Sequence, residues 1–204
     1  MLGEEFGPDR TDAAHVWVID PIDGTRQFAA GLGNWAVLVA LCRDGVPVLG
    51  VIDLPLAGAR HWAVTEGGSW FAAGGPARRV ACRGTADLAR AVVALANPDS
   101  LTPPARAALT GLGALRVHDG GSPAYGALAR GRVDLVVNGG DLDAFDICAL
   151  VPVVAEAGGR ISGWDGAALG LDSRGAILAA ATPSLMAAAR AWLDGARLDS
   201  PGAG

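Results

Sequence analysis

The sequence predicts a mixed α/β fold, either α+β or layered α/β, because strand hairpins come first and mixed strands and helices follow. Apolar runs over 35–42 and 46–52 flank Asp44-Gly45, a turn dipeptide typical of antiparallel hairpins. From residue 92 onwards, short strand-like runs alternate irregularly with segments of helical apolar spacing. This order does not match a regular series of strand–helix–strand units.

The first part of the chain is predicted to form strands. Val16–Ile19 is β-branched or aromatic at every position, which predicts a fully buried strand that stops at Asp20-Pro21. The two hairpin strands come next, and then a strand over 60–65, a glycine turn at 67–68 and a loop over 74–76.

The second part mixes both element types. We expect strands over 92–96, 115–118, 133–137 and 176–180, and helices over 103–112, 123–130, 144–157 and 183–193. Gly158-Gly159 is a typical C-cap for the 144–157 helix. Pro152 should either kink that helix or lie where the lost hydrogen bond is tolerated. We therefore predict a sheet subdomain over 1–82, an α/β subdomain over 83–198 and a tail over 199–204.

Composition limits the class of protein. The 204 residues are 51% hydrophobic, enough for one substantial core or two small ones. The net charge is -5, the arginines are scattered and lysine is absent, so we expect no nucleic-acid partner. No apolar run is long enough to span a bilayer, which predicts no membrane partner. Three cysteines in apolar runs suggest buried free thiols and a cytoplasmic location.

Asp20 and Asp23 are the first candidates for chemistry. They lie on either side of a proline turn at the end of an apolar strand, and Gly24-Thr25 follows directly. Two carboxylates three residues apart across such a turn can point into one pocket and hold Mg²⁺, with the Ile22 carbonyl as a further oxygen ligand. Taken alone, the same residues are more typical of a capped turn than of a metal site.

Two other acidic segments change that interpretation. Glu4 and Glu5 lie at the end of a short predicted strand, and three aspartates crowd the start of the 144–157 helix. Capping of that helix explains Asp143. Asp146 lies between Phe145 and Ile147, inside the first turn of this apolar helix, and capping does not easily explain it. His118, beside a glycine-rich loop, is interpreted as a surface residue, with substrate contact as the alternative.

Three segments together resemble the inositol monophosphatase family. The run WVIDPIDGT, residues 17–25, is similar to the first signature of that family. Phe145-Asp146 followed by Glu156-Ala157-Gly158-Gly159 is similar to the second signature, and Gly3-Glu4-Glu5 to the acidic segment upstream of the first. The segments occur in the family's order. Arg26 and the runs 45–55, 60–64 and 120–137 look most like the histidinol-phosphate phosphatase branch.

The resemblance implies a layered αβαβα sandwich and hydrolysis of a phosphomonoester with two or three Mg²⁺ ions. The metal ligands that it implies are Glu4, Asp20, Ile22, Asp23 and Asp146. The catalytic residues that it implies are Glu4, Asp23 and Thr25. The substrate-binding residues that it implies are Gly24, Thr25, Arg26, Gly121, Ser122 and Asn138.

This sequence departs from the family pattern at three places. Gln27 stands where inositol phosphatases usually carry Asn, and Gly139 stands where the family usually has a Glu that contacts substrate. The family also has helices before its Gly-Glu-Glu segment, so we expect a fragment or a start codon assigned too late. An apolar sheet face would then be exposed, which favours pairing with another chain as a homodimer.

The resulting hypothesis is a Mg²⁺-dependent phosphatase that hydrolyses L-histidinol phosphate in histidine biosynthesis. One alternative keeps the reaction but assigns inositol phosphate or another small phosphomonoester as the substrate. Another alternative, from a different class, is an inactive truncated fragment that acts only as a binding or dimerising module.

Overall fold

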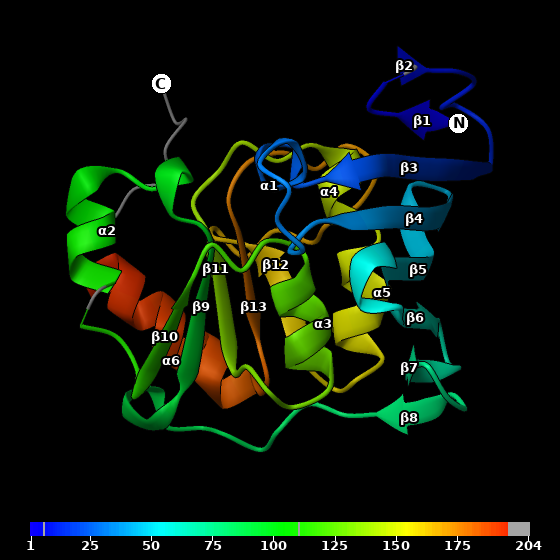
Figure 1. Ribbon diagram of the computed structural model, residues 1–204. Coiled ribbons are helices and arrows are strands. Elements are labelled where there is room, and N and C mark those ends of the chain that lie inside the picture. Colours follow the sequence, from blue (N-terminus) through cyan, green and yellow to red (C-terminus); the bar gives the residue numbers. More distant parts are fainter. Residues whose placement is uncertain (6, 110, 196–204) are drawn as a thin grey trace.

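The larger of two sheets in the computed structural model has eight strands in the order β2-β1-β3-β4-β5-β6-β7-β8 (Figure 1). The model describes residues 1–5, 7–109 and 111–195. Its strands are β1 (Leu2–Gly3), β2 (Gly7–Pro8), β3 (His15–Asp23), β4 (Ala36–Arg43), β5 (Val46–Leu54), β6 (Ala59–Val64), β7 (Gly68–Ala73) and β8 (Arg78–Val80). Neighbours pair antiparallel, except that β1 runs parallel to β3.

The second sheet has five strands in the order β10-β9-β11-β13-β12. They are β9 (Val92–Asn97), β10 (Leu115–His118), β11 (Leu135–Asn138), β12 (Arg160–Gly163) and β13 (Ile177–Ala180). β9 pairs parallel with β10 and β11, whereas β13 is antiparallel to both of its neighbours. The sheet is therefore mixed.

The helices form layers against these sheets. They are α1 (Thr25–Ala29), α2 (Pro103–Leu109), α3 (Pro123–Ala129), α4 (Ala144–Ile147), α5 (Leu150–Ala155) and α6 (Pro183–Gly195), with 3-10 turns over Pro55–Ala57, Leu88–Arg90 and Pro98–Ser100. In Figure 1, α3 and α5 lie between the two sheets, and α2 and α6 lie beyond the smaller sheet. The mixed, layered α/β prediction is confirmed.

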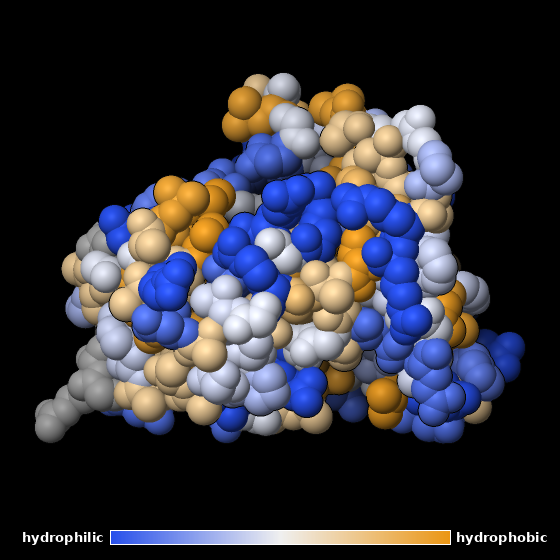
Figure 2. All heavy atoms as spheres, turned by 90° about the horizontal axis from the view of Figure 1, so that it is seen from below, coloured by the Kyte–Doolittle hydropathy of each residue, from blue (hydrophilic) through white to orange (hydrophobic). Residues whose placement is uncertain are grey.

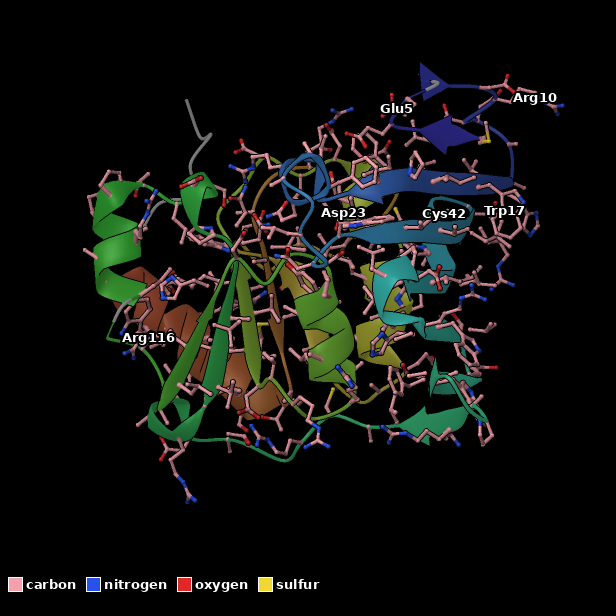
Figure 3. The ribbon with its side chains drawn as sticks, in the orientation of Figure 1. Glu5, Arg10, Trp17, Asp23, Cys42 and Arg116 are labelled. Carbon is pink, nitrogen blue, oxygen red and sulfur yellow. The ribbon has the colours of Figure 1, made fainter. Side chains whose placement is uncertain are left out.

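The predicted full burial of Val16–Ile19 is wrong. Val16 and Val18 are buried, but Trp17 is 47% exposed and lies at the outer edge of the sheet in Figure 3. The strand also continues through Pro21 to Asp23 instead of stopping at Asp20. Alternating side chains of β3 face opposite sides of its sheet, and only one side packs against the helices. An all-apolar sequence therefore does not establish that both faces are covered.

The predicted single helix over 144–157 is also wrong, because the structure has two short helices. α4 ends at Ile147 and α5 begins at Leu150. Pro152 is the third residue of α5, where its missing N–H leaves no internal hydrogen bond unmade, and its ring disfavours a continuous helix through Cys148. Gly158, with φ of 88°, follows α5 as the C-cap pattern predicted.

Four strands were missed by the sequence analysis, namely β2, β7, β8 and β12. β2, β8 and β12 have only two, three and four residues, and β7 begins inside the predicted glycine turn. Pairing with neighbouring strands decides all four. The helix predicted over 103–112 ends at Leu109, and the tail predicted over 199–204 lies outside the described residues.

One buried apolar cluster spans the space between the sheets and includes Leu38, Ile52, Val136 and Ile177. The division into subdomains at residue 82 stays a prediction, although β1–β8 make one sheet and β9–β13 the other.

On the lower face, opposite α1 and α4, hydrophilic side chains form a curved band (Figure 2). None of the described helices is long and apolar enough to cross a membrane.

Candidate active site

Asp20 and Asp23 reach the same side of the sheet because β3 is irregular at its end. In a regular strand, residues three apart point to opposite faces. The pairing of β3 with β4 shifts register between Asp20 and Asp23, so the two carboxylates can face one pocket. The Ile22 N–H donates to Asp20 Oδ1 at 2.9 Å, which closes the turn around Pro21.

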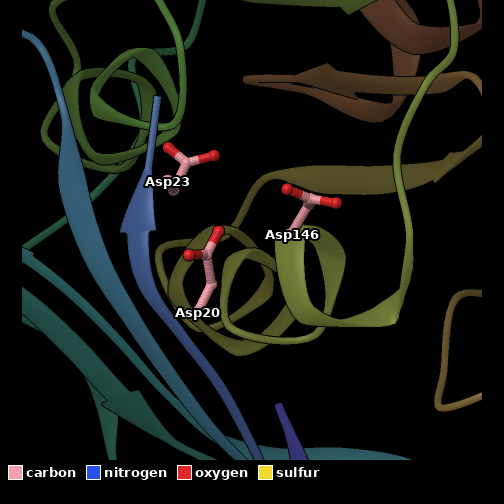
Figure 4. Close-up of side chains that lie close together, drawn as sticks. All are labelled: Asp20, Asp23 and Asp146. Carbon is pink, nitrogen blue, oxygen red and sulfur yellow. The ribbon is translucent and has the colours of Figure 1, made fainter. Parts of the chain in front are cut away.

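Asp146 completes a cluster of three carboxylates (Figure 4). It enters from α4, and one oxygen atom from each of the three residues lies within 4.8 Å of the others. Asp146 Oδ2 also accepts the Asp143 N–H at 2.8 Å, so its carboxylate caps α4 while it faces the other two aspartates. Capping and clustering are therefore both properties of this one side chain.

Crowding and burial disfavour the ionised forms of these groups. Burial, followed by the charge of Asp23, raises the pKa of Asp20 to about 8. Burial also raises the pKa of Asp146 to about 7, and the neighbouring charges of Asp23 and Glu4 add to it. Asp23 has a raised pKa for the same reason, partly offset by a hydrogen bond from Ser122. A bound cation would relieve the repulsion among the ionised forms of these carboxyl groups.

Glu4 lies beside this cluster. Gly3 of β1 is paired with Ile19 of β3, and the Glu4 N–H donates to the Ile19 carbonyl at 3.3 Å. This register brings Glu4 next to Asp20, and a hydrogen bond between their carboxyl groups contributes to the raised pKa of Asp20. Parallel pairing of a two-residue strand thus adds a fourth acid to the site.

The donor set fits a hard divalent cation. Carboxylate and carbonyl oxygens are the ligands that Mg²⁺ prefers, and three mutually repelling aspartates would be neutralised by it. Asp20, Asp23 and Asp146 would hold such an ion, with Glu4 and the Ile22 carbonyl beside them. The Thr25 hydroxyl donates to that carbonyl at 3.3 Å, so its lone pairs are left to accept a hydrogen bond.

Two glycine-containing turns form the rest of the wall. Gly24, with φ of 89°, precedes α1, and a Cβ there would approach the Trp35 Cα to 3.3 Å, so the close turn requires glycine. Gly121 lies in the loop between β10 and α3, and its N–H donates to the Ala96 carbonyl at 2.9 Å. Ser122, next in that loop, donates its hydroxyl hydrogen bond to Asp23.

A cavity of about 200 Å³ adjoins the cluster and is lined by Asp23, Gly24, Thr25, Arg26, Gln27, Ala96, Asn97, Asp119, Gly121, Ser122, Tyr125, Asn138, Asp141, Leu142, Asp146 and Leu150. It therefore brings together every predicted substrate-binding residue. A larger groove of about 650 Å³ lies over β5 and β6, and none of the clustered carboxylates lines it. The smaller cavity is the candidate site because Asp23 and Asp146, whose pKa values are raised, line it.

Arg26 and Asn138 are held by protein groups at the edge of this cavity. The Arg26 guanidinium donates to Asn97 Oδ1 at 2.9 Å and to Asp99 Oδ2 at 3.0 Å. The Asn138 side-chain oxygen accepts from Ser100 Oγ at 3.3 Å and from the Gly140 N–H at 3.0 Å. Their predicted contact with substrate stays a prediction.

Asn97, Asp119 and Tyr125 line the cavity but were missed by the sequence analysis, which noted Gln27 only as a departure from the family pattern. Gln27 Nε2 donates to Asp119 Oδ1 at 2.8 Å, and this contact joins α1 to the end of β10. Asp119 has φ of 57° and directly follows His118. The sequence analysis considered His118, and not Asp119, as a possible substrate contact. His118 itself is exposed and does not line the cavity, in agreement with its interpretation as a surface residue.

Two sheets with helices between them, and a cluster of aspartates where β3 meets α4, define a layered α/β protein with an acidic site of the cation-binding kind. The chain belongs to the inositol monophosphatase family, whose family model matches residues 1–193. Enzymes of this family use divalent metals, which agrees with the donor set described above.

Among similar proteins is a histidinol-phosphatase from Mycobacterium tuberculosis, 36% identical over 173 residues, which are 82% of this chain and 66% of that protein. An inositol-1-monophosphatase ImpA from Mycolicibacterium smegmatis is 33% identical over 188 residues, covering 87% of this chain and 66% of that protein. A solved inositol monophosphatase from Zymomonas mobilis superposes with a TM-score of 0.84 at 32% identity, covering 93% of this chain and 74% of that one.

The chain spans about two thirds of the length of these curated relatives. The matched part of a Streptomyces coelicolor histidinol-phosphatase is 64% of that protein. The family match and the superposition show the family and the fold of this chain. Its activity, substrate and assembly are proposals, because the chain covers only part of these relatives.

Proposed function

We propose that this chain hydrolyses a small phosphomonoester, L-histidinol phosphate first among the candidates, with two or three Mg²⁺ ions. The observation that carries the proposal is the cluster of Asp20, Asp23 and Asp146, with carboxylate oxygens within 4.8 Å of one another. Asp23 and Asp146 of this cluster line the cavity. Bound Mg²⁺ would supply Lewis acidity, lowering the pKa of a water and neutralising charge in an in-line displacement.

The residues of the chain contribute orientation and proton transfer. Thr25 donates to the Ile22 carbonyl, so its oxygen accepts a hydrogen bond from the attacking water. Glu4, exposed beside Asp20, accepts the proton of that water as general base. Gly24 and Gly121 allow the backbone to approach the phosphate closely, and Ser122 fixes the orientation of Asp23.

Charge at the cavity favours a substrate that carries a cation. Asp23, Asp119, Asp141 and Asp146 line the cavity. Arg26 lines it as well, but its charge is paired with Asp99. L-histidinol phosphate has an ammonium group and an imidazole, and inositol monophosphate has only hydroxyls. Similarity to proteins named histidinol-phosphatase supports the same choice.

Inositol monophosphate is the second candidate, because similar proteins carry that activity in their names. Phosphate release by the purified chain with Mg²⁺ should be faster from histidinol phosphate than from inositol 1-phosphate. The opposite order would reject histidinol phosphate but keep the reaction. Asp20→Asn should abolish release, and Asp165→Asn, at a turn outside the cavity, should leave it unchanged.

Release from neither substrate by the wild-type chain would favour the third alternative, a binding or dimerising module. The homodimer stays a prediction that light scattering coupled to size-exclusion chromatography tests directly. The cytoplasmic location also stays a prediction. It agrees with the three free cysteines, Cys42, Cys82 and Cys148.

A further inference from the structure

Tyr125 is the single tyrosine of the chain and lines the cavity beside the carboxylate cluster. It lies on α3, three residues after Ser122, and its side chain is only 2% exposed. Its ring packs in the core between the two sheets. The metal ligands and substrate-binding residues named above do not include its hydroxyl group.

The Tyr125 hydroxyl has no hydrogen-bond partner among the residues that the structure describes. A buried hydroxyl without a partner is costly, and nearly all such groups in folded proteins are paired with protein, water or ligand. The neighbouring carboxylates of Asp23 and Asp146 do not accept from it; Asp23 accepts from Ser122, and Asp146 Oδ2 accepts from the Asp143 N–H. A group that enters the cavity is therefore the natural partner.

This hydroxyl is a hydrogen-bond donor. A phenol has an ordinary pKa of about 10, so it keeps its proton over the whole physiological range. A group that enters the cavity to pair with it must offer a hydrogen-bond acceptor, and phosphoryl oxygens are strong acceptors.

We propose that the Tyr125 hydroxyl donates a hydrogen bond to a phosphoryl oxygen of the bound substrate and of the phosphate product. Tyr125 is then a substrate-binding residue at the inner wall of the cavity. The inference rests on the proposed function, because it requires a phosphate group to occupy this cavity.

A spectroscopic test is possible because there is one tyrosine. The chain labelled with [¹³Cζ]tyrosine should give one ring-carbon resonance, whose chemical shift reports the hydrogen bond of the hydroxyl. We expect the resonance to move when inorganic phosphate is added in the presence of Mg²⁺, and to move little with Mg²⁺ alone. A shift complete with Mg²⁺ alone would overturn the proposal, since the partner would then be water on the metal.

The second test is Tyr125→Phe, which keeps the ring and removes the hydroxyl. Calorimetry with Mg²⁺ should show inorganic phosphate binding about tenfold to a hundredfold more weakly, as expected for a lost hydrogen bond to a charged acceptor. The ligand-free protein should keep its melting temperature, because no internal hydrogen bond is lost. A lower melting temperature with unchanged phosphate affinity would assign the hydroxyl a structural role instead.

Ser69→Ala is the matched control. The Ser69 hydroxyl on β7 is also buried and unpartnered among the described residues, but it does not line the cavity. Its removal should leave phosphate affinity unchanged. Equal phosphate affinities of the wild type and Tyr125→Phe would overturn this inference alone. A wild-type protein that binds no phosphate would overturn the proposed function as well.

Discussion

The Ser122 hydroxyl donates a hydrogen bond to the Asp23 carboxylate, although 99 residues separate them in the sequence. Asp23 ends β3 of the eight-stranded sheet, beside α1 in Figure 3, and Ser122 precedes α3, which packs between the sheets. This contact joins the first acidic motif to the loop that follows β10. It also favours the ionised form of Asp23, which is the form that binds a cation.

Ser122→Ala should therefore weaken Mg²⁺ binding. Without the hydroxyl, the pKa of Asp23 rises further. We expect Mg²⁺ affinity to fall about tenfold or more, as when a hydrogen bond to a charged group is lost. The onset of phosphatase activity should move to higher pH. Calorimetric titration with Mg²⁺ measures the first effect. The same titration of Ser69→Ala, a buried serine away from the cavity, should match wild type, and equal affinities for all three proteins would contradict the prediction.

The metal-free protein should lose stability between about pH 4 and about pH 8. Burial raises the pKa of Asp20 from its ordinary 3.8 to about 8, so its contribution is fully present below pH 4 and is lost as pH rises through the folded pKa. Asp20→Asn should remove this loss and stabilise the metal-free protein at pH 7 by roughly 2–4 kcal/mol. Urea unfolding with EDTA at several pH values checks this, and a flat wild-type profile would show that the carboxyl is not perturbed.

Binding of Mg²⁺ should release protons. Because the pKa values of Asp20 and Asp146 are raised to about 8 and about 7, both groups hold protons near neutrality that the ion must displace. Affinity should fall about tenfold per pH unit for each proton released as pH drops below 7. Calorimetry in two buffers of different ionisation enthalpy counts these protons directly. Equal heats in the two buffers would mean that the carboxylates are already ionised.

Asp119→Asn should reduce selectivity for a cationic substrate. Asparagine tolerates the left-handed φ of 57° at this position, so the backbone should be preserved. We expect kcat/KM for histidinol phosphate to fall about tenfold and that for inositol 1-phosphate to change less, because only the former presents an ammonium group. Asp44→Asn, with φ of 50° in the β4–β5 turn, is the matched control. An equal fall for both substrates would argue against charge recognition.

Arg26→Gln should affect catalysis more than stability. The Arg26–Asp99 ion pair is exposed, with 62% and 69% of the two side chains accessible, and should contribute less than about 1 kcal/mol to stability. We expect kcat/KM for histidinol phosphate to fall several-fold, because Arg26 lines the cavity. Arg106, which is 3.7 Å from the same Asp99 but outside the cavity, supplies the control variant Arg106→Gln. Equal kinetics for both variants would remove Arg26 from the substrate-binding set.

Much of the fold could be predicted because it depends on local sequence. The β4–β5 hairpin follows from Asp44-Gly45, and the end of α5 follows from Gly158, where few backbone conformations fit. The break between α4 and α5 and the exposed face of β3 could not be predicted in the same way. They depend on what packs against each segment, which local pattern does not record.

The sequence by itself determined the acids of the site, since strand-end aspartates at 20 and 23 and an unexplained aspartate at 146 were visible as residue types in particular positions. Only the tertiary structure decided that they meet, because the irregular end of β3 turns Asp23 toward Asp146 of α4, which lies 123 residues further along the chain. It also decided which hydroxyl groups have partners: Ser122 reaches Asp23, and Tyr125 is buried beside Asp23 and Asp146 with no partner in the described part of the chain. Hydrogen bonds and desolvation depend on distances that close only when the two sheets pack together.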